Sequence, residues 1–303
     1  MEKSMKQYAG RTFNAEDIEQ IQWTRKAFPQ LSETELACTI CETLGWVSKS
    51  GIPKRVTCKK FLVQLAAEGT IDLPKSRGTG GNTEDRERKA AERVSQLSDK
   101  VEEITRVGNI LLEIAQAGPR LQLLRAYLRK YHMLGDNGAY GEALYYFITD
   151  GSGAELGCMR FSVASWWLED RETWIGWTKE QKDSRLFLIV NQSRFLIFPW
   201  VKVKNLASRA LSLAARRIGG DWLERYCYEP VLLETFVDRS HFMGTCYKAA
   251  NWRLVGQTKG RGRNDRHAER ALSIKDIYLY PLRRDCREIL RGDKPFKAVN
   301  PDE

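Results

Sequence analysis

Five acidic residues in the second half of the chain are of the type that metal-dependent phosphodiester cleavage requires. That chemistry needs two or three carboxylates that converge on a metal ion. The candidates are Asp170, Glu172, Asp221, Glu234 and Asp238. Glu234 and Asp238 close the apolar segment LLETFVD, and their spacing of four places them on one face of a regular strand. We predict these two as a catalytic pair. The alternative is that they form salt bridges with nearby arginines, since the sequence contains no D-x-D or PD-(D/E)xK pattern typical of nucleases.

The densest basic segment of the chain has a composition suited to phosphate binding. It contains Lys259, Arg261, Arg263, Arg266 and Arg270, interrupted by Gly260 and Gly262. Arginine can bind phosphate through two parallel hydrogen bonds, and glycine lets the backbone follow a phosphate chain closely. This composition predicts a nucleic-acid contact, and a solvated, disordered loop is the alternative.

Composition narrows the class of protein. The 303 residues carry a formal net charge of +10, which favours a polyanionic partner such as nucleic acid. No stretch approaches the roughly 18 uninterrupted apolar residues of a membrane span, and the N-terminus lacks the apolar core of a signal peptide. We therefore expect a cytoplasmic protein without membrane contact, whose seven cysteines are reduced. Three scattered histidines predict no metal site.

The element that organises the second half of the chain is predicted to be a parallel β-α-β unit over residues 187–238. Two apolar runs, FLIVNQSRFLIFPWV and PVLLETFVD, flank a segment with apolar residues at helical spacing. Asn205 is placed to cap this helix, and Lys202 and Lys204 precede its N-terminus. Free backbone N–H groups at a helix N-terminus favour an anion, so an anion site is predicted there.

The first 80 residues are predicted to form a winged helix-turn-helix domain. Within residues 14–73 three helical patterns are followed by the short extended segment TIDLP, which is the order of that fold. Asn14 is expected to open the first helix, and the inward face of the third is expected to consist of Cys58, Phe61, Leu62 and Leu65. The third helix and the loop before it carry Lys54, Arg55, Lys59 and Lys60, which are suited to phosphate contacts on a helix that enters a groove of DNA. A protein-interaction module with a solvated basic face is the alternative.

A charged linker and helix over residues 81–106 would join this domain to an α/β domain over residues 107–303. In that domain the segments ALYYFITD and ELGCMRFSVAS, separated by the turn residues GSGA, are predicted to form a hairpin. Four tryptophans of the large domain lie close together in sequence, and we expect them to be core residues, although exposed ones could stack on bases. They are Trp166, Trp167, Trp174 and Trp177.

The order of elements predicted for the large domain resembles the GNAT acyltransferase fold. In that family a glycine-containing motif after a central strand holds the pyrophosphate of coenzyme A, and the matching residues here are Lys202, Lys204, Asn205 and Ala207. Asn205 stands where the family has glycine. The segment YKAANWRLVG resembles the closing helix and strand of the family, in which a tyrosine often acts as general acid. The resemblance implies this role for Tyr247.

A second resemblance covers nearly the whole chain. The segments FLVQLAAEGTIDLP, NQSRFLIFPWV, LLETFVD, GTCYKAANW and IYLYPL occur in the same order as in the DruA family of Druantia anti-phage defence systems, a domain also associated with bacterial transposases. This resemblance implies a role in defence, a helicase-like partner protein and nucleic acid as the target.

Together these features predict an α/β protein in which a winged helix-turn-helix is joined to a GNAT-like mixed sheet. The expected function is a DNA-binding subunit that cooperates with a helicase-like partner, without a cofactor and with a homo-oligomer as one possible assembly. The alternatives are a metal-dependent nuclease and a diverged acyl-CoA-dependent acyltransferase.

Overall fold

The structure is a computed structural model that describes residues 6–9, 11–27, 33–46, 54–73, 83–98, 102–115, 118–136, 142–259 and 273–299. The chain divides into two compact units, Met1–Asp85 and Arg86–Glu303.

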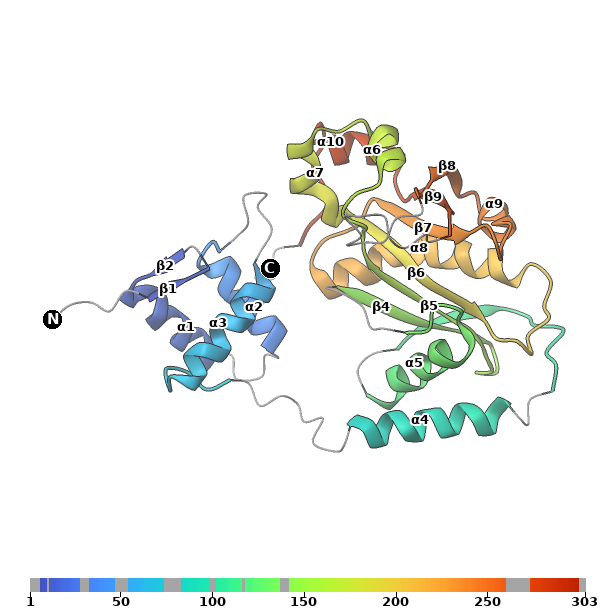
Figure 1. Ribbon diagram of the computed structural model, residues 1–303, viewed down its shortest axis with the longest axis horizontal. Coiled ribbons are helices and arrows are strands. Elements are labelled where there is room, and N and C mark those ends of the chain that lie inside the picture. Colours follow the sequence, from blue (N-terminus) through green and yellow to red (C-terminus); the bar gives the residue numbers. More distant parts are fainter. Residues whose placement is uncertain are drawn as a thin grey trace. The chain divides into compact units, whose positions relative to one another are not determined.

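The N-terminal unit is a two-stranded sheet followed by three helices, drawn in blue in Figure 1. Its elements are β1 (Lys6–Tyr8), β2 (Arg11–Phe13), α1 (Ala15–Ala27), α2 (Glu33–Thr43) and α3 (Arg55–Ala67). Asn14 caps α1 as predicted, since its Oδ1 accepts a hydrogen bond from the backbone N–H of Asp17 at 2.8 Å. Phe61 of α3 stacks on Phe13, with ring centroids 4.3 Å apart, and meets the edge of Trp46. An apolar, largely aromatic core therefore holds the unit together.

The sequence identified the helices of this unit but not the position of its strands. The buried face of α3 consists of Cys58, Phe61, Leu62 and Leu65, as predicted. The segment after α3 does not form a strand in the described residues 70–73; instead, side chains of α1 bind its backbone, with Gln22 donating to the carbonyl of Thr70 and Arg25 to that of Asp72. The described strands, β1 and β2, precede the helices. A winged arrangement is therefore not confirmed.

The large unit is built on a seven-stranded mixed sheet with strand order β3-β4-β5-β6-β7-β9-β8. Its strands are β3 (Ile110–Ile114), β4 (Ala143–Asp150), β5 (Glu155–Val163), β6 (Ile189–Ile197), β7 (Leu232–Asp238), β8 (Arg253–Gln257) and β9 (Lys275–Pro281). Its helices are α4 (Thr83–Ser98), α5 (Pro119–Tyr131), α6 (Glu169–Ile175), α7 (Lys179–Arg185), the 3-10 turn η1 (Leu186–Leu188), α8 (Leu206–Tyr226), α9 (Thr245–Ala249) and α10 (Cys286–Arg291). Only β6 and β7 pair in parallel among these strands, and the predicted β4–β5 hairpin is confirmed.

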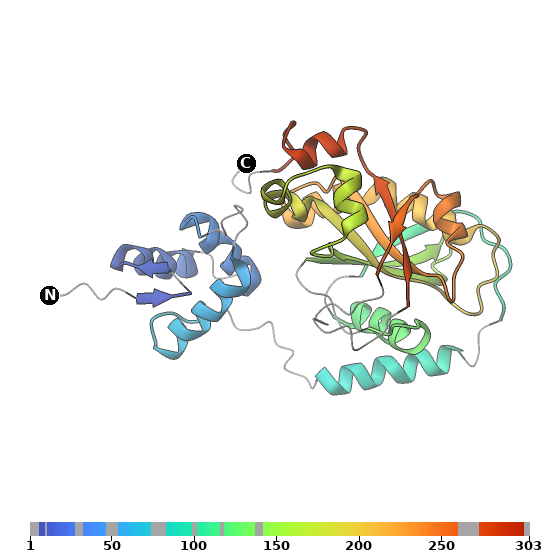
Figure 2. The same ribbon diagram turned by 45° about the horizontal axis from the view of Figure 1, so that its top comes forward.

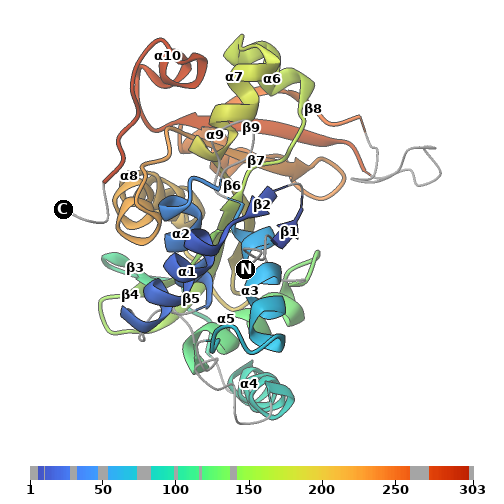
Figure 3. The ribbon, with the colours of Figure 1, turned by 90° about the vertical axis from the view of Figure 1, so that its left-hand side faces the viewer.

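Helices α5 and α8 cover opposite faces of the sheet (Figure 2). Neighbouring residues of a strand point to opposite faces. Tyr146 of β4 donates a hydrogen bond to Asp221 of α8 at 2.8 Å, whereas the next residue, Phe147, meets the ring of Tyr127 of α5 edge to face. In Figure 3, α4 and α8 are seen nearly end-on, with strands of the sheet between them. The sheet is thus covered by helices on both faces.

The predicted β-α-β unit is formed by β6, α8 and β7, and α8 is longer than the sequence suggested. The apolar residues at helical spacing that predicted this helix end at Ile218, and Gly219 and Gly220 follow, but α8 continues to Tyr226. Trp222 lies beyond the glycines and is fully buried, so the last turns gain a core contact. Gly219 fits a close approach, since a Cβ there would lie 2.9 Å from Oε1 of Glu229.

Two of the tryptophans expected in the core lie on the surface. The side chains of Trp166 and Trp167 are 64% and 62% exposed, and only Trp174 and Trp177 pack against the core. The ammonium group of Lys182, a buried residue, lies 5.4 and 4.2 Å from the ring centroids of Trp166 and Trp167. A cation–π contact therefore holds the two indoles at the surface.

Two further expectations concern thiols and membranes. None of the cysteines whose side chains the structure describes forms a disulfide with another of them, and most of them are buried. Among the described helices, none combines the length and the apolar character that crossing a membrane requires.

Candidate functional site

The two parallel strands at the centre of the large unit diverge after a short stretch of pairing. Residues Ile189–Asn191 of β6 pair with Leu232–Glu234 of β7, whereas β6 runs on to Ile197 and β7 to Asp238. Gln192 lies at the point of divergence and is 3% exposed. Its carbonyl accepts a hydrogen bond from Thr235 at 2.9 Å, and its side-chain oxygen accepts one from Tyr247 at 2.7 Å. The place where β6 and β7 diverge is thus bridged by side chains of the protein itself.

Tyr247, expected from the GNAT resemblance as a general acid, is part of this internal network. Burial raises the pKa of its hydroxyl above the ordinary value for tyrosine. Its ring stacks on Tyr278 and meets the edge of Trp252. The hydroxyl that would donate a proton is directed to Gln192, so Tyr247 joins α9 to β6.

Glu234, one of the two predicted catalytic residues, is fully buried and ion-paired. One carboxylate oxygen accepts a hydrogen bond from Arg171 and the other from the backbone N–H of Ser165, both at 2.7 Å. Burial by itself would lower the pKa of Arg171, but Glu234 and Glu172 outweigh it, so the pKa lies above the ordinary value. This carboxylate ties β7 to α6 and to the segment before it.

Asp238 lies on the same face of β7 as Glu234, because β7 pairs continuously with β9 from Leu232 to Asp238. Four residues of strand separate the two carboxylates by about 13 Å, too far to share one metal ion. Asp238 accepts hydrogen bonds from Ser240 and Ser273, which lower its pKa. It therefore anchors the turn after β7.

The remaining candidate carboxylates also have partners. Asp170 accepts from the backbone N–H of Gln257, Glu172 from Arg171, and Asp221 from Tyr146 and Arg217. Within the described part of the chain, no group of three His, Cys, Asp or Glu side chains could hold a metal ion.

The segment between β6 and α8, where an anion site was predicted, is basic and solvent-exposed. Lys202 and Lys204 are exposed, and the segment is held in place because the N–H of Lys202 donates to the carbonyl of Ile104 at 2.8 Å. Asn205 stands at the N-cap position with a left-handed backbone (φ 60°), and its side chain makes no capping hydrogen bond. Its carbonyl accepts from Arg209 and Ser208 instead. Ala207 lies within the first turn of α8.

The four basic residues that were predicted to contact DNA from the third helix are distributed unevenly around α3. Lys60 lies on the face opposite the buried one, between the exposed Val56 and Val63, and Lys59 lies at its flank. Lys54 and Arg55 are half-buried at the start of the helix. The outer face of α3 thus combines apolar and basic side chains.

Of the basic segment 259–270, only Lys259 falls within the described residues. It is exposed and forms an ion pair with Glu169 at the start of α6. Arg261, Arg263 and Arg266 lie outside the described residues.

Arg209 and Arg216, which lie seven residues apart on α8, are not among the residues predicted from the sequence. Two turns separate them, so they share one face of the helix. Arg209 donates to the carbonyl of Gly108 at 2.6 Å, and Arg216 is exposed. Their spacing is a signal that the sequence already contained.

Comparisons with known proteins identify one family. Residues 64–270 match the family model described as Druantia protein DruA. Comparison with curated proteins gave no match.

Among solved structures, the chain is similar to a spermidine N-acetyltransferase from Vibrio cholerae, with 9% identity, a TM-score of 0.34, and coverage of 61% of this chain and 98% of that one. A Klebsiella pneumoniae protein assigned as an acyl-CoA N-acyltransferase has 13% identity and a TM-score of 0.35, covering 57% and 98% of the two chains. Similarity at this level says nothing about activity.

Proposed function

Because the chain belongs to the DruA family, we propose that it is a nucleic-acid-binding subunit of a bacterial anti-phage defence system. Membership of the family implies the role in defence. The proposal adds that nucleic acid is the ligand, that the protein binds rather than cleaves it, and that a helicase-like protein is the partner.

The observation that carries the proposal is the distribution of charge. Residues 1–85 hold 12 Lys and Arg against 11 Asp and Glu, a net charge of +1, whereas residues 86–303 hold 37 against 28, a net charge of +9. Nearly the whole excess thus belongs to the large unit. A concentrated positive potential attracts the phosphate backbone of nucleic acid and speeds the encounter with it.

The exposed cations Lys202, Lys204 and Arg216 are available for this role. Their side chains have no ion-pair or hydrogen-bond partner among the described residues, and all three belong to α8 or to the segment before it. The outer face of α3, with Lys59 and Lys60, is proposed as a second contact. Its exposed valines suit apolar contact with a thymine methyl group in the manner of a recognition helix.

The engagement of the candidate catalytic residues favours binding over catalysis. Glu234, Asp238 and Tyr247 each make internal hydrogen bonds, and the two carboxylates are too far apart to share one metal ion. A nuclease or an acyltransferase that used these residues would have to break those contacts first.

The test is binding of the full-length protein to labelled duplex and single-stranded DNA across a salt series, with magnesium and with a chelator. We expect affinity to fall steeply with salt, by about 0.9 in the log–log slope for each phosphate contact on duplex DNA, and the DNA to stay intact. Cleavage that needs magnesium would replace the binding role with a nuclease. Absence of binding at low salt would overturn the proposal.

The partner is tested separately with the purified helicase-like protein of the same defence system. We expect the chain to raise the affinity of that helicase-like protein for DNA, and no such increase would remove this part of the proposal.

A further inference from the structure

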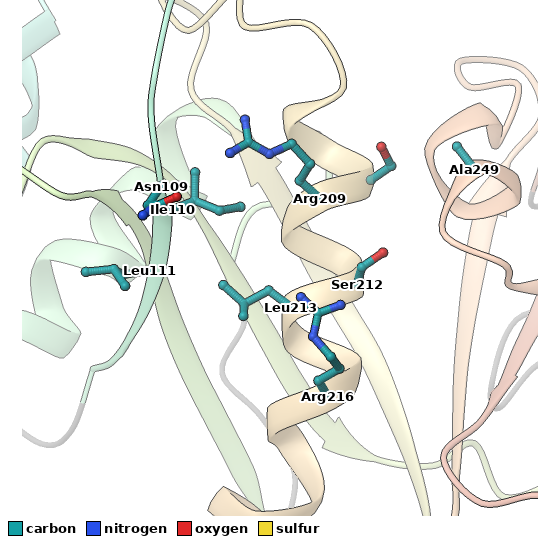
Figure 4. A pocket seen from close by; sticks show the side chains of 9 residues that line it. Asn109, Ile110, Leu111, Arg209, Ser212, Leu213, Arg216 and Ala249 are labelled. Carbon is teal, nitrogen blue, oxygen red and sulfur yellow. The ribbon is translucent and has the colours of Figure 1, made fainter.

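An open groove of about 560 Å³ runs along α8 (Figure 4). Arg209 and Leu213 extend from α8 towards the start of β3, and Ser212 lies on the side that faces Ala249 of α9. We call this feature the α8 groove. It is lined by Asn109, Ile110, Leu111, Ser208, Arg209, Ser212, Leu213, Arg216 and Ala249.

The lining combines positive charge, hydrogen-bonding groups and an apolar wall. Two arginines and two serines face the groove, and no carboxylate is among the described residues that line it. The guanidinium of Arg216 is exposed and has no partner in the described part of the chain. Ile110, Leu111 and Leu213 supply apolar surface, and the side chain of Leu111 is 55% exposed. Such a lining suits a ligand that carries both a phosphate and an apolar ring.

The walls of the groove are fixed to one another. Arg209 donates to the carbonyl of Gly108, and Arg217 donates to the carbonyl of Leu112, so α8 is tied to the residues just before β3 and to the middle of that strand. The opposite face of α8 is buried in the core through residues such as Ala210, Leu211 and Ile218. A ligand would therefore enter a preformed groove and would not have to order it, which lowers the entropic cost of binding.

We propose that the α8 groove binds the backbone of a nucleic-acid strand, with Arg216 and Arg209 on phosphates and a base or sugar against the apolar wall. The identity of the ligand rests on the proposed function. Arg209 and Arg216 begin about 10 Å apart along the helix axis, farther than one phosphate group spans, so they suit neighbouring phosphates of a chain. Lys202 and Lys204 extend the positive surface beyond the N-terminus of α8, as a strand longer than one nucleotide requires.

The experiment compares single-site variants of the full-length protein by fluorescence anisotropy with a labelled single-stranded oligonucleotide. Arg216→Gln removes one phosphate contact and is expected to weaken binding about fivefold near 100 mM salt and to reduce the salt slope by about 0.7. Ser212→Gln narrows the groove without a change in charge and is expected to weaken binding by a similar factor.

Arg284→Gln is the matched control, since Arg284 is exposed, without a partner among the described residues, and follows β9. The last residue of β9, Pro281, pairs with Leu232 at the start of β7, so Arg284 lies at the opposite end of the sheet from the N-terminus of α8. The Arg284→Gln variant should retain the wild-type slope of log affinity against log salt to within about 0.2 if contacts in the groove, and not net charge alone, govern binding.

The outcomes separate this inference from the proposed function. If the wild-type protein binds the oligonucleotide but Arg216→Gln and Ser212→Gln behave like Arg284→Gln, the groove assignment is wrong and the binding function stands. If the wild-type protein binds neither this oligonucleotide nor duplex DNA, the proposed function itself fails, and if it binds duplex DNA but not the oligonucleotide, the groove assignment alone is wrong. A second titration with ATP tests a free nucleotide: ATP that binds in an Arg216-dependent way while the oligonucleotide does not would overturn the assignment of a strand.

Discussion

The two units of the chain use charge differently. The N-terminal unit has nearly balanced charges and an apolar core around Phe13, Trp46 and Phe61, and its one buried polar side chain among the described residues is that of Thr24. The large unit buries several ionised groups, among them the Arg171–Glu234 pair, and still carries almost all of the excess positive charge. The charged side chains that the structure describes in the small unit lie at its surface, whereas the large unit also contains ion pairs in its interior.

This difference indicates which charges are available to a ligand. Arg171 and Arg160 are neutralised inside the protein by Glu234 and Asp136. The exposed cations along α8 and the segment before it are among those that a polyanion can reach. The comparison can be tested first by removing an internal charge and then by removing surface charges from each unit.

Glu234→Ala should give the largest effect. The substitution leaves Arg171 buried without its main partner, and breaking a buried ion pair costs about 3–5 kcal/mol of stability. Thermal or urea unfolding measures the loss. Asp238→Ala, on the same strand but at the surface end, should cost clearly less. Equal effects of the two substitutions would contradict the internal role of Glu234.

His132 should make the large unit sensitive to acid. Burial, together with Arg194 and Arg160, lowers its pKa from 6.5 to about 4. Because the unfolded chain then binds this proton more readily than the folded one, the stability contribution is present above pH 6.5 and is lost as the pH falls towards 4. With allowance for solvent screening, the loss is about 2 kcal/mol. His132→Gln should flatten the stability profile over this range, and an unchanged profile would show that another group is responsible.

The N-terminal unit should contribute a smaller share of DNA binding. Lys59→Gln with Lys60→Gln removes two cations from α3 and is expected to weaken duplex binding about tenfold, with a slope smaller by up to about 1.8. Lys26→Gln, at the end of α1, is the control on the same unit. A complete loss of binding in the α3 variant would reverse the comparison and make the small unit the main contact.

Tyr247→Phe should have the smallest effect. It removes the hydrogen bond to Gln192 and leaves a buried acceptor unpaired, which costs about 1 kcal/mol of stability. DNA affinity should not change, because the residue is internal to the large unit. A loss of affinity without a loss of stability would show that the hydroxyl meets a ligand.

Elements with a strong local pattern could be predicted from the sequence. The buried face of α3, the β4–β5 hairpin and the β6-α8-β7 unit are each determined by apolar periodicity over consecutive residues, and all three are confirmed. The strands β1 and β2 are only three residues long and were missed, because so short a segment shows no apolar periodicity. The length of α8 was underestimated because the burial of Trp222 outweighs the cost of two glycines.

The roles of the site residues could not be predicted, because they depend on contacts between distant parts of the chain. Nothing near Glu234 in the sequence shows that Arg171, 63 residues away, neutralises it. Nor does the sequence show that Gln192, where β6 and β7 diverge, accepts hydrogen bonds from Thr235 and Tyr247. The spacing of Arg209 and Arg216 was visible, but only the placement of β3 beside α8 makes a groove of that helix face.

The most direct test of the account is the salt dependence of duplex DNA binding by a variant that combines Lys202→Gln, Lys204→Gln and Arg216→Gln. If the exposed cations of the large unit form the binding surface, the slope of log affinity against log salt should fall by about 2.7 relative to the wild-type protein. A slope equal to that of the wild-type protein, in a variant with unchanged thermal stability, would contradict the central claim.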